Sequence, residues 1–346
     1  MQEMSAEARR IAVVGGGAWG SALAIHGSRS GHEVRLWIRE AELVRRLVER
    51  RDNPLYLPGV RFPRAVQPCD DLAHAVQDAE LVVAVVPSQY ARQVYRGMRD
   101  SIAPGTPIVV ATKGIEESTL ALPLQVAAEE LPAAGSLAIL SGPSFASEVA
   151  RGIPTAIVIA SEDDDLAQQV QRALSDGNLR LYTNQDPLGV QLAGALKNVI
   201  AIAAGVADGL DMGANVLAAL ITRGLAEISR LGGKLGAKPS TFSGLAGLGD
   251  LVLTCTGELS RNRGVGRRLG RGERLEDILT TTRSVAEGIR TTRCAWMLAQ
   301  RLDVQMPIVE EAHRILYLDG SPKEALARLM GRPLTSEDEH PREPAG

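Results

Sequence analysis

The feature that most constrains the fold is an apolar run that leads directly into three spaced glycines. Residues 10–20 read RIAVVGGGAWG, so Gly15, Gly17 and Gly20 form a GxGxxG pattern after a stretch typical of a buried strand. A small-residue segment over 18–30 has a helical pattern, and residues 33–38 form a second strand pattern. Strand, glycine loop, helix and strand in this order are the context in which such a loop binds a dinucleotide. We predict a dinucleotide site here rather than a flexible turn.

Each glycine has a separate task in this prediction. The first makes the tight turn, the second lets the backbone approach the pyrophosphate, and the third lets helix and strand pack closely. The phosphates then lie at the helix N-terminus, from Ala18 onward, where free amides and the helix dipole favour negative charge.

The end of the second strand bears on the choice of cofactor. An NAD site usually has an acidic residue there, about 20 residues after the glycines. Here Arg39 stands at that point and Glu40 follows. Because an arginine can pair with a 2′-phosphate, the sequence favours NADP over NAD as cofactor. It leaves NAD open, and it equally allows Arg39 to be a solvated loop residue.

Similar apolar runs recur through the first half of the chain. Most are continuously apolar, as expected when helices cover both faces of a parallel sheet. Their alternation with helical stretches predicts a doubly wound α/β sheet of the Rossmann type. We predict strands over 10–14, 33–38, 81–86, 108–111, 137–140, 156–160 and 179–182.

The pattern changes near residue 185. Residues 187–207 carry one charged side chain, Lys197, and are too long for a strand, which predicts a buried helix. Further helical patterns cover 215–231, 284–302 and 307–317. We therefore predict a dinucleotide-binding domain over 1–185 and an all-helical substrate and catalytic domain over 186–335. The polar stretch 336–346 is predicted to be a disordered tail.

Composition excludes several classes of protein. The net charge of −3 provides no electrostatic reason to expect binding to nucleic acid or membranes. The three cysteines are widely spaced, so we expect reduced thiols and no metal site. No signal peptide is expected, and no apolar run reaches the ~18 residues of a membrane span. A cytoplasmic protein without membrane insertion is expected, with a homodimer as the default assembly.

Polar residues follow two further strands. Lys113 comes after the strand at 108–111, and Gly142 and Ser144 come after the strand at 137–140. Ligands of open α/β sheets bind beyond the carboxyl ends of the strands. Each motif alone is commonly a turn, but their convergence on one edge predicts a ligand site.

Lys197 is the sharper candidate, because a lysine is almost never buried without a partner. It either extends to the surface along its helix or has a chemical role. Burial lowers a lysine pKa, which suits the group to exchange a proton with an alcohol. The segment GLGDLVLTCTGELSRNR at 247–263 is a further candidate, in which Asp250 can accept hydrogen bonds from substrate hydroxyls. Its residues Ser260, Arg261 and Asn262 have the composition of a phosphate site.

These motifs resemble those of the bacterial-type sn-glycerol-3-phosphate dehydrogenases that use NAD or NADP. The resemblance runs from about Arg10 to Arg332 through GGGAWGSALA, VVPSQ, ATKG, SGPSFA, GALKNVIAIAAG, ALITRGLAE and the segment at 247–263. It implies reduction of dihydroxyacetone phosphate to sn-glycerol 3-phosphate, a precursor of glycerophospholipids. It also implies a second domain like the C-terminal domain of 6-phosphogluconate dehydrogenases.

The resemblance assigns roles to individual positions. Lys197 matches the proton acceptor. The substrate-binding positions are Lys113, Gly142, Ser144, Lys197, Asp250, Ser260, Arg261 and Asn262. The cofactor positions are Trp19, Arg39, Lys113, Ala146, Arg261, Val285 and Glu287, beside the glycine loop. Ala18 stands where the family often has a serine, which puts one hydroxyl contact in doubt.

Two alternatives stay open from the residues. Another two-domain reductase, of the hydroxyacid or ketopantoate type, shares the glycine loop and a helical lysine, but the SRN cluster favours a phosphorylated substrate. A non-catalytic dinucleotide sensor would be expected to lack Lys113, Lys197 or Asp250, and all three are present.

Overall fold

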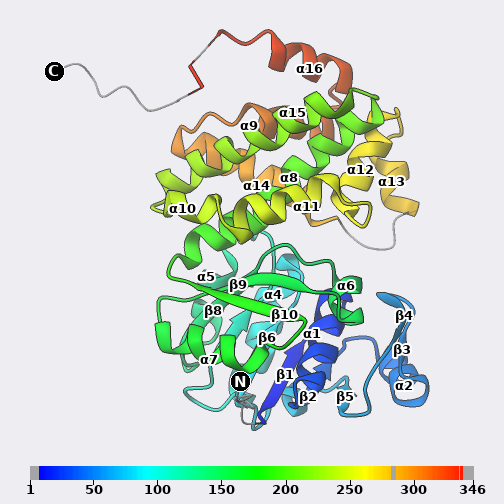
Figure 1. Ribbon diagram of the computed structural model, residues 1–346, viewed down its shortest axis with the longest axis vertical. Coiled ribbons are helices and arrows are strands. Elements are labelled where there is room, and N and C mark those ends of the chain that lie inside the picture. The colour runs from blue at the N-terminus through cyan, green and yellow to red at the C-terminus, as the bar shows by residue number, and fades with distance from the viewer. Residues whose placement is uncertain (1–7, 282–285, 335, 338–346) are drawn as a thin grey trace, which may run out of the picture.

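The computed structural model describes residues 8–281, 286–334 and 336–337. A sheet with helices on its faces forms one half of the molecule, and a group of helices forms the other (Figure 1). The strands are β1 (Arg10–Val14), β2 (Glu33–Trp37), β3 (Asp52–Asn53), β4 (Leu57–Arg61), β5 (Val66–Cys69), β6 (Leu81–Ala84), β7 (Ile108–Val110), β8 (Leu137–Ser141), β9 (Thr155–Ala160) and β10 (Leu179–Asn184).

The helices of the sheet-containing half are α1 (Ala18–Arg29), α2 (Ala41–Arg50), α3 (Leu72–Val76), α4 (Ser88–Met98), α5 (Pro123–Glu130), α6 (Ala146–Arg151) and α7 (Asp164–Leu174), with a 3₁₀ turn η1 (Arg99–Ser101). Those that follow are α8 (Pro187–Gly209), α9 (Gly213–Lys234), α10 (Pro239–Phe242), α11 (Asp250–Thr256), α12 (Arg261–Gly270), α13 (Leu275–Thr281), α14 (Glu287–Leu302), α15 (Pro307–Tyr317) and α16 (Pro322–Met330), with a π-helical turn η2 (Leu245–Gly249).

The main sheet has the strand order β10-β9-β8-β7-β6-β1-β2-β5, and all seven predicted strands are present in it. β5, an edge strand, and the small β3–β4 pair were not predicted from the sequence. β1 pairs with β2 on one side and with β6 on the other, so the order in which strands are added to the sheet reverses at β1. Ligands of such sheets bind beyond the carboxyl ends of the strands at this point, which places the ligand-binding crevice at the end of β1.

The sheet departs from the parallel arrangement at one edge. β8 and β9 pair antiparallel, and β10 follows β9 in parallel. The segment between β8 and β9 holds only α6, whose 6 residues extend about 9 Å. Such a helix is too short to carry the chain back along β8, so β9 returns in the opposite direction.

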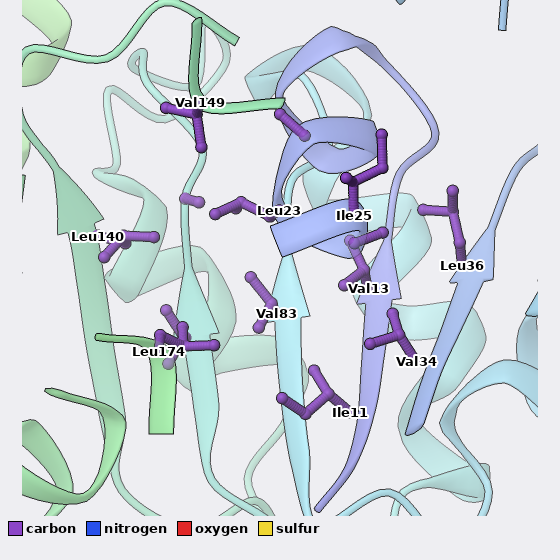
Figure 2. Packing of buried hydrophobic residues seen from close by; sticks show 14 of the residues in the cluster. Ile11, Val13, Leu23, Ile25, Val34, Leu36, Val83, Leu140, Val149 and Leu174 are labelled. Atoms are coloured by element: carbon purple, nitrogen blue, oxygen red, sulfur yellow. The ribbon is translucent and has the colours of Figure 1, made fainter. Parts of the chain in front are cut away.

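The continuous apolar pattern of β1 arises because both faces of the sheet are covered. Ile11 and Val13 contribute to the core under α1, and Figure 2 shows them beside Leu23 and Ile25 of that helix. The alternate residues of β1 join a second core that includes Tyr95 of α4. Successive side chains of a strand point to opposite faces, so all positions of β1 after the exposed Arg10 are apolar.

α8 connects the two halves. Its first turn is capped by the Asp186 carboxylate, which accepts the Gly189 amide at 2.9 Å. Val190 belongs to the core of the sheet, whereas the residues from Leu192 onward form the core of the helical half. Among the described helices α8 alone is long and apolar enough to cross a membrane, and 94% of its most apolar window is buried inside the protein.

Glycines allow α12 to lie unusually close to α8. A Cβ on Gly266 would come within 2.0 Å of the Ile202 carbonyl oxygen, and one on Gly205 within 2.1 Å of the Arg263 carbonyl oxygen. The two backbones therefore touch, as small residues permit. This contact brings the start of α12 toward the middle of α8, where Lys197 lies.

Candidate active site

The glycine loop has the geometry that a dinucleotide site requires. Gly15 adopts φ +123°, and a Cβ there would lie 2.7 Å from the Val85 carbonyl oxygen. A Cβ on Gly20 would come within 1.8 Å of the Gly15 carbonyl oxygen, so only glycine lets α1 start this close to β1. Gly15 therefore makes the tight turn and Gly20 allows the close packing of helix and strand, which are the tasks expected of the first and third glycines.

Gly17 differs, because nothing lies within 4 Å of the position that its Cβ would take. It is the N-cap of α1, and no side chain caps this end of the helix. The open space beside free helix amides fits a pyrophosphate. Ala18 and Trp19 form the first turn, and the buried Trp19 Nε1 has no hydrogen-bond partner among the described residues.

Arg39 lies just beyond β2, with its side chain 66% exposed. Its guanidinium pairs with the Glu40 carboxylate at 3.0 Å and stacks over the Tyr90 ring at 5.5 Å from the ring centre. Glu40 also accepts a hydrogen bond from the Tyr56 hydroxyl at 3.4 Å. A cation and a carboxylate thus stand together where the adenosine ribose is expected.

Lys197, Lys113 and Asp250 meet at the carboxyl edge of the sheet. Lys113 Nζ contacts Asp250 Oδ2 at 2.8 Å, and Lys197 Nζ pairs with Asp250 Oδ1. Asp250 is 1% exposed and Lys197 6% exposed, so Lys197 does not extend to the surface. Three residues that are far apart in sequence form one cluster with two ammonium groups and one carboxylate, in which Lys197 and Asp250 are buried and Lys113 is partly exposed.

Thr254, which was not predicted as a site residue, completes this cluster. Its Oγ1 accepts a hydrogen bond from Lys197 Nζ at 2.9 Å and donates to the Asp250 carbonyl at 2.6 Å. Thr254 and Asp250 are four residues apart on α11, so they share a face of that helix. This spacing was a signal that could have identified it.

Burial lowers the pKa of Lys197 to about 7. The attraction of Asp250 opposes this shift, and the like charge of Lys113 adds to it. Burial by itself would raise the pKa of the Asp250 carboxyl, but the two ammonium groups outweigh burial and hold it below its usual value. A lysine with a pKa near neutrality can both donate and accept a proton at physiological pH.

Gly142 and Ser144 border the same cluster. The Gly142 carbonyl accepts hydrogen bonds from Lys113 Nζ at 3.3 Å and from Ser144 Oγ at 3.1 Å. Gly142 adopts φ +139°, and a Cβ there would lie 2.9 Å from the Ile157 Cα. Ala146 is the first residue of α6, four residues beyond Gly142.

The SRN cluster lies at the start of α12. Ser260 is the N-cap, and its Oγ accepts the Arg263 amide at 3.3 Å. Arg261 is the first helical residue and is exposed. The backbone amides of Arg261 and Asn262 lie in the first turn of this helix, so its N-terminus is suited to bind an anion.

The Asn262 side chain is occupied by other parts of the protein. Its Nδ2 donates to Asn198 Oδ1 at 2.8 Å, and its Oδ1 accepts the Gly288 amide at 3.0 Å. Asn198 follows Lys197 on α8, so this pair ties α8, α12 and α14 together. The side chain therefore positions the cluster, which leaves the Asn262 amide for a ligand.

Glu287 begins α14 next to Gly288. Desolvation raises the pKa of Glu287 to about 7, although the positive charges of Arg261, Lys113 and Lys197 lower it in part. Glu287 therefore lies within electrostatic range of these three cations. The remaining predicted cofactor residue, Val285, lies outside the described residues, as does most of the predicted tail at 336–346.

A glycine-loop sheet with a buried lysine at its carboxyl edge, supplied by a helical second half, defines a dinucleotide-dependent dehydrogenase. Comparison with known protein families identifies which family of dehydrogenases this is. The chain belongs to the NAD-dependent glycerol-3-phosphate dehydrogenase family, whose N-terminal profile matches residues 10–167 and whose C-terminal profile matches residues 186–327.

Relatives support this over nearly the whole chain. The glycerol-3-phosphate dehydrogenase [NAD(P)+] of Koribacter versatilis is 51% identical, over 95% of this chain and 98% of its own. That of Citrifermentans bemidjiense is 49% identical, over 95% of this chain and 99% of its own. The crystal structure of the Coxiella burnetii glycerol-3-phosphate dehydrogenase superposes with a TM-score of 0.90 at 39% identity, covering 94% of this chain and 99% of that one.

A ketopantoate reductase from Ralstonia eutropha shares the fold at a TM-score of 0.58 and 17% identity, over 92% of this chain and 99% of that one. This likeness concerns the fold alone. It explains why the residues by themselves left that class of reductase open, and the family match does not favour it.

Proposed function

We propose that this chain reduces dihydroxyacetone phosphate to sn-glycerol 3-phosphate with NADPH or NADH, for glycerophospholipid synthesis. The observation that carries the proposal is the cluster of buried Lys197 and Asp250 with the partly exposed Lys113, beside a helix N-terminus suited to a phosphate. The family of the chain supports the same reaction.

Reduced nicotinamide, when bound at the glycine loop, supplies the hydride for carbon 2 of the substrate. Lys197 Nζ donates the proton to the oxygen of that carbon and is left neutral. In the reverse direction the neutral amine accepts that proton. Asp250 and Thr254 hold Nζ in place in both states, because each contacts it directly.

Lys113 provides the second positive charge at the reacting oxygen. It pairs with Asp250 at 2.8 Å, so the ionised cluster carries a net charge of about +1 when both lysines are protonated. A fixed positive charge stabilises the alkoxide that develops as the carbonyl is reduced. Ser144 and Gly142 lie next to Lys113 and supply polar groups for the substrate hydroxyl.

The phosphate of the substrate is held at the start of α12. Arg261 offers a guanidinium, Ser260 a hydroxyl, and Asn262 its backbone amide at the positive end of the helix. Glu287, Ala146 and Val285 are proposed to contact the cofactor. Holding the phosphate at one end fixes the carbonyl relative to Lys197 at the other.

The direct test is to follow NADPH absorbance after adding dihydroxyacetone phosphate to the purified protein. We expect turnover with this substrate, and the product should be sn-glycerol 3-phosphate. Turnover with a 2-oxo acid or ketopantoate instead would favour the other reductases. Tight NADPH binding with no turnover of any of these compounds would favour a non-catalytic sensor.

Cofactor preference tests the role of Arg39. We expect Arg39→Ala to raise the KM for NADPH about 10-fold and to leave the KM for NADH within about twofold, because only NADPH has the 2′-phosphate that a guanidinium binds. Glu40→Gln is the matched variant: it removes the carboxylate that pairs with Arg39, so the KM for NADPH should fall. Equal changes for both cofactors in Arg39→Ala would contradict the assignment.

We place the proposed enzyme in the cytoplasm as a homodimer, without nucleic acid or membrane insertion. The burial of α8 within the protein supports the last point. Size-exclusion chromatography with light scattering measures the oligomeric state.

A further inference from the structure

Asn53 lies directly behind the glycine loop, although it is 37 residues from Gly16 in the chain. It belongs to the small β3–β4 pair, which was not predicted from the sequence. The side chain is fully buried, at 0% exposure. The β3–β4 pair therefore places a buried side-chain amide directly against the glycine loop.

The Asn53 side chain is hydrogen-bonded through both of its polar atoms. Nδ2 donates to the Gly16 carbonyl at 3.0 Å and to Ser21 Oγ at 3.0 Å, while Oδ1 accepts the Tyr56 amide at 3.0 Å. Ser21 Oγ in turn donates to the same Gly16 carbonyl at 3.2 Å. Two donors thus converge on one backbone oxygen from the inner side of the loop.

This arrangement sets the direction of the next amide. In a planar trans peptide the carbonyl of one residue and the N–H of the following residue point in opposite directions. Because Asn53 and Ser21 hold the Gly16 carbonyl inward, the Gly17 N–H points outward. Nothing lies within 4 Å of the position that a Cβ on Gly17 would take, so there is open space beside this amide.

The Gly16 peptide is also restricted from the other side. A Cβ on Gly16 would lie 2.4 Å from Cγ1 of Ile38, which packs against this glycine. The peptide is thus held between Ile38 and the Asn53 amide. A donor fixed before the ligand arrives costs less ordering entropy on binding.

We propose that Asn53 is a positioning residue for the cofactor pyrophosphate: by holding the Gly16 carbonyl it orients the Gly17 amide toward the phosphate oxygens. The inference rests on the proposed dinucleotide-dependent function and adds a residue outside the glycine loop to it. The groups that it recognises indirectly are the diphosphate oxygens, which NADPH, NADH and ADP-ribose share.

The test is isothermal titration calorimetry on the full chain with NADPH, ADP-ribose and adenosine 2′-monophosphate, which lacks the pyrophosphate. We expect Asn53→Ala to weaken NADPH and ADP-ribose about 10-fold, the loss of one well-placed hydrogen bond. Binding of adenosine 2′-monophosphate should stay within about twofold. In steady-state assays the KM for NADPH should rise while kcat at saturating NADPH stays within about twofold.

Two further variants separate positioning from loss of local structure. Asn53→Asp keeps the size of the side chain and the acceptor for the Tyr56 amide but removes the donor to Gly16, so it should show the same selective loss. Ser21→Ala leaves the Asn53 bond to Gly16 and should weaken NADPH by no more than about threefold. Asn178→Ala, at an exposed asparagine, is the neutral control.

An equal loss for all three ligands in Asn53→Asp would show a merely structural role, and unchanged NADPH binding would exclude any role. These outcomes are distinct from failure of the proposed function. If the proposed function were wrong, the wild-type protein would bind NADPH normally but would not turn over dihydroxyacetone phosphate.

Discussion

Replacing Lys197 by alanine is expected to lower kcat for dihydroxyacetone phosphate reduction by about 10³-fold, because a positioned general acid contributes about 10²–10⁴-fold. NADPH binding should change little. Asp250 keeps its ion pair with Lys113 at 2.8 Å in the variant, so no unpaired carboxylate is left buried. Steady-state NADPH absorbance gives kcat, and NADPH fluorescence titration gives the Kd.

The pH dependence supplies a second readout for the same residue. Burial lowers the pKa of Lys197 to about 7, so the protonated acid is present below about pH 7 and the neutral base above it. In the wild-type enzyme kcat/KM for reduction should therefore fall as the pH rises through about 7. For oxidation of glycerol 3-phosphate it should rise over the same range.

In Lys197→Ala, the change of kcat/KM with pH near 7 should disappear for both reduction and oxidation. Lys234→Ala, at an exposed lysine in the last turn of α9, is the matched control and should retain wild-type rates and pH profiles. If Lys197→Ala kept kcat within about threefold of wild type, the role of Lys197 in proton transfer would have to be abandoned.

Replacing Arg261 by alanine is expected to lower kcat/KM for dihydroxyacetone phosphate by about 30–150-fold, mainly through KM. This corresponds to about 2–3 kcal/mol for a lost hydrogen bond to a charged group. Arg261→Lys keeps the charge but loses the planar fork, so it should recover only part of the loss. Initial rates over a range of substrate concentrations measure these values.

Unphosphorylated dihydroxyacetone provides the comparison that isolates the phosphate. It has no dianion for Arg261 to bind, so Arg261→Ala should leave its kcat/KM within about twofold. Arg271→Ala, at an exposed arginine after the other end of α12, should leave both substrates unaffected. A parallel loss for both substrates would mean that Arg261 supports the fold or the cofactor rather than the phosphate.

Local chemistry explains what could be predicted from the sequence. Residues 10–20 combine the pattern of a buried strand with the glycine spacing of a tight turn and a closely packed helix. The loop and β1 could therefore be predicted. The apolar run at 187–207 likewise predicted α8, with Lys197 as its one charge. Elements without such periodicity were missed. β3 has 2 residues, and β5 contains a proline at a sheet edge.

The direction of β9 was missed for a different reason. Its composition is that of any buried strand, and pairing direction depends on how far the connecting α6 can carry the chain. That is a property of the assembled sheet rather than of residues 155–160. Asn53 was missed in the same way, because its partners Gly16 and Ser21 lie far away in the sequence. The four-residue spacing of Thr254 from Asp250 is local, but Lys197, which both residues contact, comes from another helix.

The sequence alone determined the chemical inventory: a glycine loop for a dinucleotide, an arginine after the second strand, a lysine in an apolar helix, and an SRN cluster suited to a phosphate. Tertiary structure decided which of these groups act together. Glycine contacts bring α12 against α8, and α8 runs from the sheet into the helical half. α11 packs against the same helix α8, so Asp250 of α11 meets Lys197 of α8 and Lys113, which follows β7. The pKa shifts of Lys197 and Asp250, and the pairing of all three residues, depend on distances of a few ångströms between segments that local sequence preferences do not encode.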